Sequence, residues 1–155
     1  MPGSESVVAE GPWAGSTLSE LIGRFGAELL GKANYARFGQ EFPLLVKFID
    51  AREDLSIQVH PDDELARKRH GKSGKCEMWY VLEAEPGASL LTGFSRPIAP
   101  AEYERRVADN TLTDVLNRQA IASGDVFYLP AGRVHSIGKG SFIVEIQQSS
   151  DITYR

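Results

Sequence analysis

The spacing of hydrophobic and polar positions predicts that this chain is built mainly from short β-strands. Residues 55–60 (LSIQVH) alternate as a strand does, with three apolar side chains on one face and Ser56, Gln58 and His60 on the other. Further strands are predicted at 43–49, 76–83, 88–94, 125–129, 134–137 and 141–147, with short ones at 6–9 and 152–154. Many short strands separated by turns rich in Gly and Pro favour a closed β-barrel or a sandwich.

A helical period appears in a few places between the strands. Thr17 and Glu20 have the spacing of a capping box, and apolar residues recur at helical spacing from there to Gly31, which predicts a helix over about residues 17–30. Shorter helices are predicted at 61–70, 100–108 and 111–116. Because no repeat or linker divides the sequence, we expect a single domain over residues 1–155, with the barrel at about 43–155.

Composition restricts the classes of function. The 155 residues are 42% hydrophobic and 25% charged, as in ordinary globular proteins, and the net charge of −4 makes nucleic acid an unexpected partner. No apolar run approaches the ~20 residues of a membrane span, and the first residues do not resemble a secretory signal. The single Cys76 excludes an internal disulfide. We therefore expect a cytoplasmic protein that binds neither membrane nor nucleic acid.

Four side chains have the chemistry of a divalent-metal site. Gln58 and His60 share one strand face, Glu77 begins the next apolar strand, and His135 follows the sharp turn at 130–132. Two imidazoles, a carboxylate and an amide oxygen form a mixed set that zinc accepts, although Mn, Co or Fe could use the same ligands. Each residue alone also has an ordinary interpretation, His60 as a hydrogen-bonded strand end and Glu77 as a surface carboxylate.

The segment around His135 resembles a known sequence signature. Residues 124–135 (GDVFYLPAGRVH) match the second signature of the cupin family, except that Lys139 stands where an Asn often follows. The first cupin signature is only partly present, since Gln58 replaces its first His and the gap from His60 to Glu77 is unusually long. The resemblance implies a mainly β fold, a single cupin-type (jelly-roll) β-barrel with a few short inserted helices.

A more specific resemblance covers most of the chain. The segments 55–61 (LSIQVHP), 74–80 (GKCEMWY), 130–135 (PAGRVH) and 150–155 (SDITYR) together look like type I phosphomannose isomerase. This resemblance implies one zinc ion held by Gln58, His60, Glu77 and His135. It also implies an active-site arginine at Arg155, substrate contacts at Ser56 and Lys75, and further pocket residues at Asp151 and Glu145.

The implied reaction interconverts mannose 6-phosphate and fructose 6-phosphate, which moves a proton between C2 and C1 of the sugar. A bound metal would stabilise negative charge on the sugar oxygens, and Arg155 suits the same oxyanion or the phosphate. Two residues compete for the proton transfer, Glu145 on a buried strand face and Lys75 beside the cation. The sequence does not choose between them.

Two rival functions come from other classes. Members of this family usually carry strands before the match and a second half after it, whereas Arg155 is the last residue here and is expected to fray. A non-catalytic cupin that binds metal or sugar phosphate is therefore one alternative, and an open barrel edge would favour a homodimer. A different cupin enzyme, such as a dioxygenase or an epimerase, is the other, and Gln58 disfavours it because oxygen-activating iron sites rely on imidazoles and carboxylates.

Overall fold

The computed structural model describes residues 5–155, so the first four positions of the sequence lie outside the described residues. The chain divides into two compact units, one ending at Leu44 and the other running from Leu45 to Arg155. The single domain expected over residues 1–155 stays a prediction. No helix of the described residues is long and apolar enough to cross a membrane.

The unit that ends at Leu44 contains three short helices, α1 (Leu18–Phe25), α2 (Ala27–Leu30) and α3 (Lys32–Phe38). The capping box is confirmed, since the Thr17 hydroxyl accepts from the Glu20 N–H at 3.1 Å and the Glu20 carboxylate accepts from the Thr17 N–H at 2.8 Å. The continuous helix predicted to residue 30 is wrong, because Gly26 takes a positive φ of 50° and ends α1. The strand predicted at 6–9 is reduced to one bridge between Val7 and Thr17.

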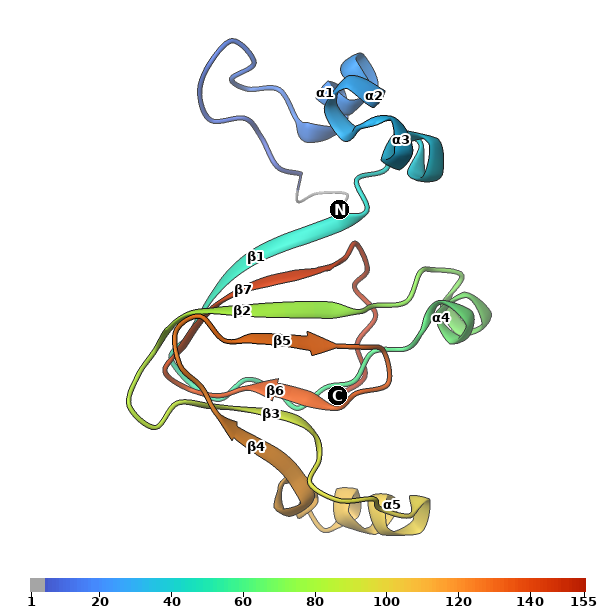
Figure 1. Ribbon diagram of the computed structural model, residues 1–155. Helices are drawn as coiled ribbons and strands as arrows, with labels where there is room; N and C mark the ends of the chain where they lie inside the picture. Colours follow the sequence, from blue (N-terminus) through green and yellow to red (C-terminus); the bar gives the residue numbers. More distant parts are fainter. Residues whose placement is uncertain (1–4) are drawn as a thin grey trace. The chain divides into compact units, whose positions relative to one another are not determined.

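Two antiparallel sheets form the second unit (Figure 1). The first contains β1 (Leu44–Ala51), β7 (Ser141–Gln148), β2 (Glu77–Ala84) and β5 (Val126–Leu129), in the order β1-β7-β2-β5. The second contains β4 (Leu116–Ala120), β3 (Ser89–Phe94) and β6 (His135–Ile137), in the order β4-β3-β6. Strand β4 was not predicted, and the helix expected at 111–116 is a short 3-10 helix, η1 (Leu112–Val115), that leads into it.

The predicted strand at 55–60 extends the second sheet without forming a regular strand. Its backbone pairs with β6 where Gln58 and His135 exchange two hydrogen bonds of 2.9 Å. On its other side Val59 and Tyr154 exchange two bonds of 3.0 Å, which brings the C-terminal segment into the same layer. This pairing places residues far apart in the sequence beside one another.

The fold class expected from the sequence is confirmed in its coarser form. The described residues form an α/β arrangement with two antiparallel sheets, and hydrogen bonds that would close these sheets into one barrel are not found among residues 5–155. The sheets enclose an apolar core, in which each fully buried Leu or Ile contributes roughly 1.5–3 kcal/mol. Its members are Ala51, Trp79, Val81, Leu90, Leu129, Ile137 and Ile143.

Two helices connect the strands. Helix α4 (Asp63–His70) begins after Asp62, whose carboxylate accepts from the Leu65 N–H at 2.8 Å, and it ends at Gly71 in the left-handed conformation. Helix α5 (Pro100–Ala108) begins with a proline, whose fixed φ suits a first helical position. Both helices confirm the sequence prediction to within two residues.

Candidate metal centre

Three predicted ligands meet inside the second unit. His60 is the last residue of segment 55–60, which pairs with β6. Glu77 is the first residue of β2, and His135 is the first residue of β6. Their potential ligand atoms all lie within 4.8 Å of one another, and each residue is at most 3% exposed. The Nε2 atoms of His60 and His135 each lie 3.3 Å from a different oxygen of Glu77. We call these three residues the metal cluster.

The outer ring nitrogens orient the two imidazoles. His60 Nδ1 lies 2.9 Å from the Ile152 carbonyl, and His135 Nδ1 lies 2.8 Å from the Arg133 carbonyl. A carbonyl can only accept, so each Nδ1 donates its proton outward, and Nε2 is the nitrogen that faces Glu77. Metal-ligating histidines use this arrangement, because the second hydrogen bond fixes the tautomer.

Three inner atoms of the metal cluster have no hydrogen-bond partner among the described residues. They are the two Nε2 atoms and Glu77 Oε2, all buried, whereas Glu77 Oε1 has the ammonium of Lys75 beside it. Burial raises the pKa of Glu77, but the neighbouring His135, His60 and Lys75 outweigh burial and hold the pKa well below its ordinary value. Two imidazole nitrogens and a carboxylate that converge in a buried space form a set of ligand atoms that a cation between them would satisfy. The donor set therefore fits a divalent cation.

Lys75 lies beside the metal cluster, as the sequence predicted. It is 6% exposed, and its Nζ lies 2.6 Å from Glu77 Oε1. The loop before it is held close to the start of α4, where the Lys75 N–H donates to the Pro61 carbonyl and the Gly74 N–H donates to Asp63. A Cβ at position 74 would lie 2.4 Å from the backbone of Asp62, so only glycine fits there.

Gln58 is placed beside His135 by its backbone. Residues directly opposite in an antiparallel pair project to the same side, so the side chains of Gln58 and His135 share one side of the layer. Gln58 is half-buried. Ligation by its amide oxygen stays a prediction.

Glu145 forms a second polar group on the inner side of the first sheet. It is 3% exposed, and its carboxylate accepts from Trp79 Nε1 at 3.1 Å and from Lys47 Nζ at 2.8 Å. The rings of Trp79 and His135 pack at a right angle with 5.4 Å between their centroids, so this indole contacts both Glu145 and the metal cluster. Lys47 was not predicted from the sequence. It shares a strand face with apolar residues, and an ammonium in such a position needs an acidic partner, which is the signal that could have identified it.

The remaining predicted residues lie on the C-terminal segment and its neighbours. Arg155 is exposed, and its Nε lies 3.0 Å from the Ser56 hydroxyl, so these two predicted substrate contacts meet. The fraying expected of Arg155 is opposed by the bridge at the preceding residue, Tyr154. Asp151 is exposed and pairs with Lys72 at 2.9 Å, and that hydrogen bond lowers its pKa.

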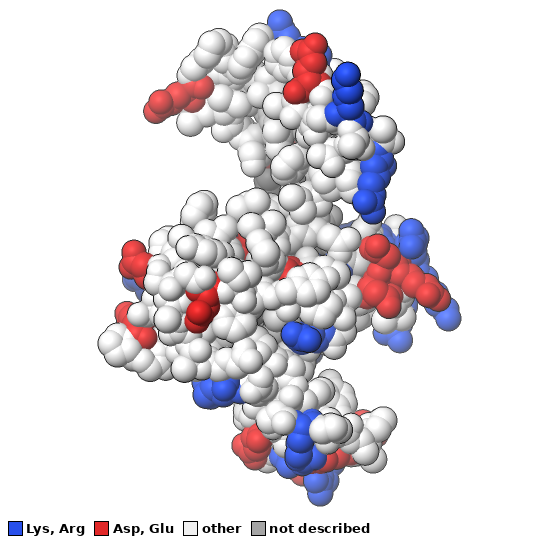
Figure 2. Space-filling view, viewed as in Figure 1, with Lys and Arg blue, Asp and Glu red and all other residues white. Residues whose placement is uncertain are grey.

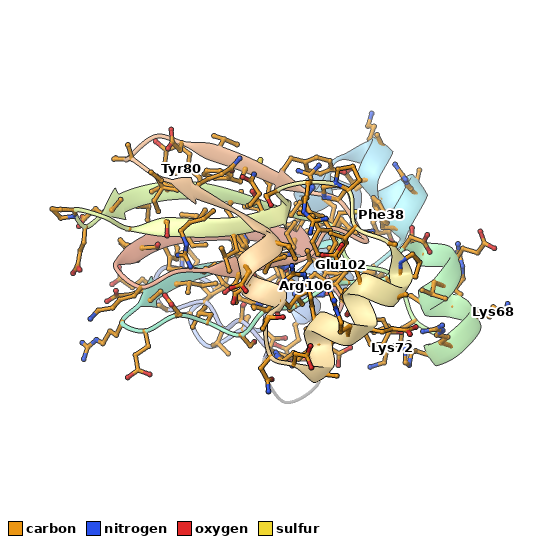
Figure 3. The ribbon with its side chains drawn as sticks, turned by 90° about the horizontal axis from the view of Figure 1, so that it is seen from below. Phe38, Lys68, Lys72, Tyr80, Glu102 and Arg106 are labelled. Carbon is orange, nitrogen blue, oxygen red and sulfur yellow. The ribbon has the colours of Figure 1, made fainter. Side chains whose placement is uncertain are left out.

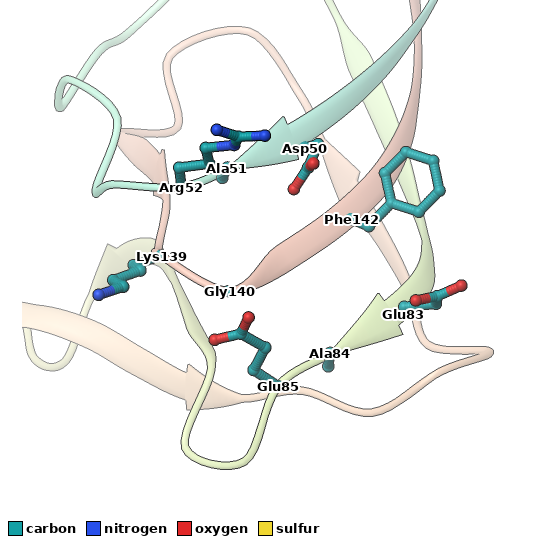
Figure 4. Close-up of a pocket in the computed structure, with 9 residues that line it drawn as sticks. All are labelled: Asp50, Ala51, Arg52, Glu83, Ala84, Glu85, Lys139, Gly140 and Phe142. Atoms are coloured by element: carbon teal, nitrogen blue, oxygen red, sulfur yellow. The ribbon is translucent and has the colours of Figure 1, made fainter.

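A separate pocket of about 360 Å³ lies at the opposite end of the same strands (Figure 4). It is lined by the ends of β1 and β2 and the start of β7, whereas Glu77 stands at the start of β2. None of the predicted site residues lines it. Its charged side chains are of both signs and all exposed: Asp50, Arg52, Glu83, Glu85 and Lys139. The buried metal cluster is therefore the stronger candidate for the functional site.

Comparison with known proteins places this geometry in a family. The chain is 40% identical to the mannose-6-phosphate isomerase of Streptococcus mutans, with 99% of the chain and 47% of that protein aligned. It is 40% identical to mannose-6-phosphate isomerase ManA of Bacillus subtilis, with 97% of the chain and 46% of that protein aligned. The chain thus spans about half the length of the curated relatives it matches.

Solved structures agree with the sequence comparison. The crystal structure of the mannose 6-phosphate isomerase from Bacillus subtilis superposes with a TM-score of 0.87 at 37% identity, covering 99% of this chain and 48% of that one. A zinc-bound mannose 6-phosphate isomerase gives a TM-score of 0.69 at 17% identity, which shows likeness of fold alone. The family described as phosphomannose isomerase type I, catalytic domain, matches residues 1–95. The chain belongs to the type I phosphomannose isomerase catalytic-domain family.

Proposed function

We propose that the metal cluster binds one divalent cation, zinc by its chemistry, with Gln58 as a fourth ligand. The single observation that carries this proposal is the set of buried, unpartnered atoms of His60, Glu77 and His135. Two imidazoles with a carboxylate and a neutral oxygen match the ligand types that zinc accepts. We propose further that the two sheets form the walls of a cupin-type barrel around this site.

We propose that the function is the interconversion of mannose 6-phosphate and fructose 6-phosphate. The support is membership of the family and relatives that are mannose-6-phosphate isomerases. When bound, the metal would supply a Lewis acid that stabilises negative charge on the oxygens of the sugar.

Lys75 is our choice for the proton transfer. A group that moves a proton between C1 and C2 has to lie within hydrogen-bond reach of those carbons. The Lys75 ammonium lies 2.6 Å from a Glu77 oxygen, whereas the carboxylate of Glu145 already accepts hydrogen bonds from Trp79 and Lys47. In this proposal Glu145 and Lys47 orient a sugar hydroxyl.

Arg155 and Ser56 form the second half of the proposed substrate site. A guanidinium always carries its charge and presents several donors in a fixed plane, which suits a phosphate or an oxyanion. Its exposed position beside Ser56 leaves its outer nitrogens accessible to such a group. Asp151, paired with Lys72, lies on the same C-terminal segment and in this proposal contacts the substrate from the rim.

A non-catalytic metal- or sugar-phosphate-binding protein is the alternative, which the same metal cluster would also serve. A coupled assay with mannose 6-phosphate, with and without a chelator, separates the two proposals. We expect turnover that stops with the chelator and returns with zinc, and Arg155→Ala should retain the metal while kcat/KM falls roughly 100-fold or more. Stoichiometric metal without turnover would support the binding protein.

A further inference from the structure

Two buried polar residues at the end of β7 belong neither to the metal cluster nor to the proposed substrate site. Gln147 is 1% exposed and Ser150 is 7% exposed. Gln147 stands directly opposite Glu77 in the pairing of β7 with β2, so the two side chains lie on the same side of the first sheet. A polar side chain that is fully buried beside a proposed metal ligand must have its hydrogen bonds satisfied by the protein.

The carboxamide of Gln147 is held at both ends. Its Oε1 accepts from the Lys47 ammonium at 2.7 Å, and its Nε2 donates to the carbonyls of Gln148 and Ser150 at 2.9 Å and 3.0 Å. An ammonium can only donate and a carbonyl can only accept, so a single orientation of the amide satisfies all three contacts. The side chain of Gln147 therefore fixes the turn that follows β7.

Ser150 joins this turn to the loop before β2 and to the C-terminal segment. Its hydroxyl donates to the Ser73 carbonyl at 2.8 Å, and the same oxygen accepts from the Ile152 N–H at 3.5 Å. The Ile152 carbonyl in turn accepts from His60 Nδ1 at 2.9 Å. We call Gln147 and Ser150 the clasp, because together they hold the backbone that supplies the acceptor for His60.

Other contacts of the C-terminal segment lie away from Ile152. Tyr154 forms a backbone bridge two residues further on, and Asp151 forms an ion pair with Lys72 in which the side chains are 48% and 58% exposed. Figure 2 shows charged side chains gathered over α4, just before Lys72, and water screens ion pairs on such a surface. Apart from His60, the clasp makes the one hydrogen bond that residues 5–155 form with the Ile152 backbone.

We propose that the clasp positions His60 for metal binding, through the backbone of Ile152. This inference rests on the proposed metal site and adds two positioning residues to it. A metal-ligating imidazole needs a fixed tautomer and a fixed ring orientation, and both depend on the acceptor behind it. His135 has its own acceptor, the Arg133 carbonyl, so the clasp acts on one imidazole of the metal cluster and leaves the other unchanged.

Two serines of the same region of the chain supply a matched pair of variants. Ser150→Ala removes a hydroxyl of the clasp, and Ser141→Ala removes a buried hydroxyl at the opposite end of β7 that donates to the Gly138 carbonyl at 2.7 Å. Titration of the full chain with zinc should show affinity about 10–100-fold lower in Ser150→Ala and within about twofold of the unaltered protein in Ser141→Ala. A purely structural role predicts equal zinc affinity in the two variants, and that result overturns the proposal.

Hydrogen exchange of the imidazole protons, followed by NMR of the full chain without added metal, tests the clasp separately from the metal site. In Ser150→Ala the Nδ1 proton of His60 should exchange at least about tenfold faster, because its acceptor is no longer held. The Nδ1 proton of His135 should exchange as in the unaltered protein. Unchanged exchange at His60 overturns the proposal whether or not zinc binds. Faster exchange at His60 in a protein that binds no zinc supports the clasp and refutes the metal site.

A second pair of variants changes the other residue of the clasp. Gln147→Glu keeps the acceptor of the carboxamide but replaces its donor with an oxygen that faces two carbonyls, so the Nδ1 proton of His60 should again exchange faster. Gln148→Glu adds the same charge one residue further on, keeps the acceptor for the Cys76 N–H and should leave this exchange unchanged. Circular dichroism confirms that each variant is folded. A folded Gln147→Glu with normal exchange at His60, or a control that exchanges equally fast, contradicts the proposal.

Discussion

Glu77 connects the two imidazoles of the candidate metal centre, because each of its oxygens faces a different Nε2. The carboxylate is held ionised by its neighbours although it is almost fully buried. The proposed cation would convert three unpartnered buried atoms into ligands, the two Nε2 atoms and Glu77 Oε2, which removes a desolvation penalty of roughly 1–3 kcal/mol for each. Metal retention should therefore depend sharply on single side chains.

The three histidines of the chain supply a matched experiment. His135→Ala should lower metal affinity at least about 100-fold, since even the loss of a group behind a ligand costs about 10–100-fold. His70→Ala should retain the metal, because His70 is exposed and bonds to Tyr154 rather than to Glu77. Metal content after dialysis measures both, and equal retention in the two variants would remove His135 from the ligand set.

At the scale of single elements, the loop between α4 and β2 positions Lys75 and Glu77. Gly74→Ala should destabilise the fold by roughly 1–3 kcal/mol and weaken metal binding, because the new methyl group meets backbone rather than a flexible side chain. Gly23 in α1 has no heavy atom within 4 Å of an added Cβ, so Gly23→Ala should instead stabilise its helix by about 0.5–1 kcal/mol. Denaturant unfolding and metal titration would show both effects, and unchanged metal affinity in Gly74→Ala would contradict the positioning role.

The ion pairs of Glu102 in helix α5 predict how the stability of the fold depends on pH. Hydrogen bonds from Arg96 and then Arg106 lower the pKa of Glu102 from 4.5 to about 2 (Figure 3). Because the folded pKa is the lower one, this stabilisation is fully present above pH 4.5 and disappears as the pH falls through 2. Its size should be small, since the ion pair with Arg96 lies at the surface, where water screens it. NMR titration of the Glu102 carboxyl should show the low pKa, and Arg96→Ala should move it back toward 4.5.

Elements with local signals were predictable from the sequence, and elements that depend on distant partners were not. The α1 cap at Thr17 and the charge order of α4 are local, and both are confirmed. The break at Gly26 depends on a positive φ beside Tyr35, and β4 depends on pairing with β3, so neither appears in a local period. Their stabilising contacts form only after the chain has folded.

The site shows the same division. Alternation along strands placed Gln58 with His60, and the turn before His135 marked a special position, so the metal cluster could be inferred from local pattern and resemblance. Lys47 was missed because its partner, Glu145, is 98 residues away in the sequence. Contacts of that separation are visible only in the folded sheet.

At the scale of the whole molecule, the two tryptophans report on different units: Trp13 belongs to the unit that ends at Leu44, and Trp79 is buried in the unit that holds the metal cluster. A ligand that binds only the folded state stabilises it, by about 2.7 kcal/mol at a free concentration 100 times its Kd. In the Trp13→Phe variant, Trp79 is the single tryptophan that reports unfolding. Zinc should raise the unfolding free energy measured from Trp79 by this amount at that concentration.

Adding His135→Ala to the Trp13→Phe variant should abolish this increase in unfolding free energy. Zinc that remains bound after dialysis but leaves the Trp79 transition unchanged would place the ion outside the core of the second unit, because a cation held by His60, Glu77 and His135 cannot bind without stabilising the strands that carry them.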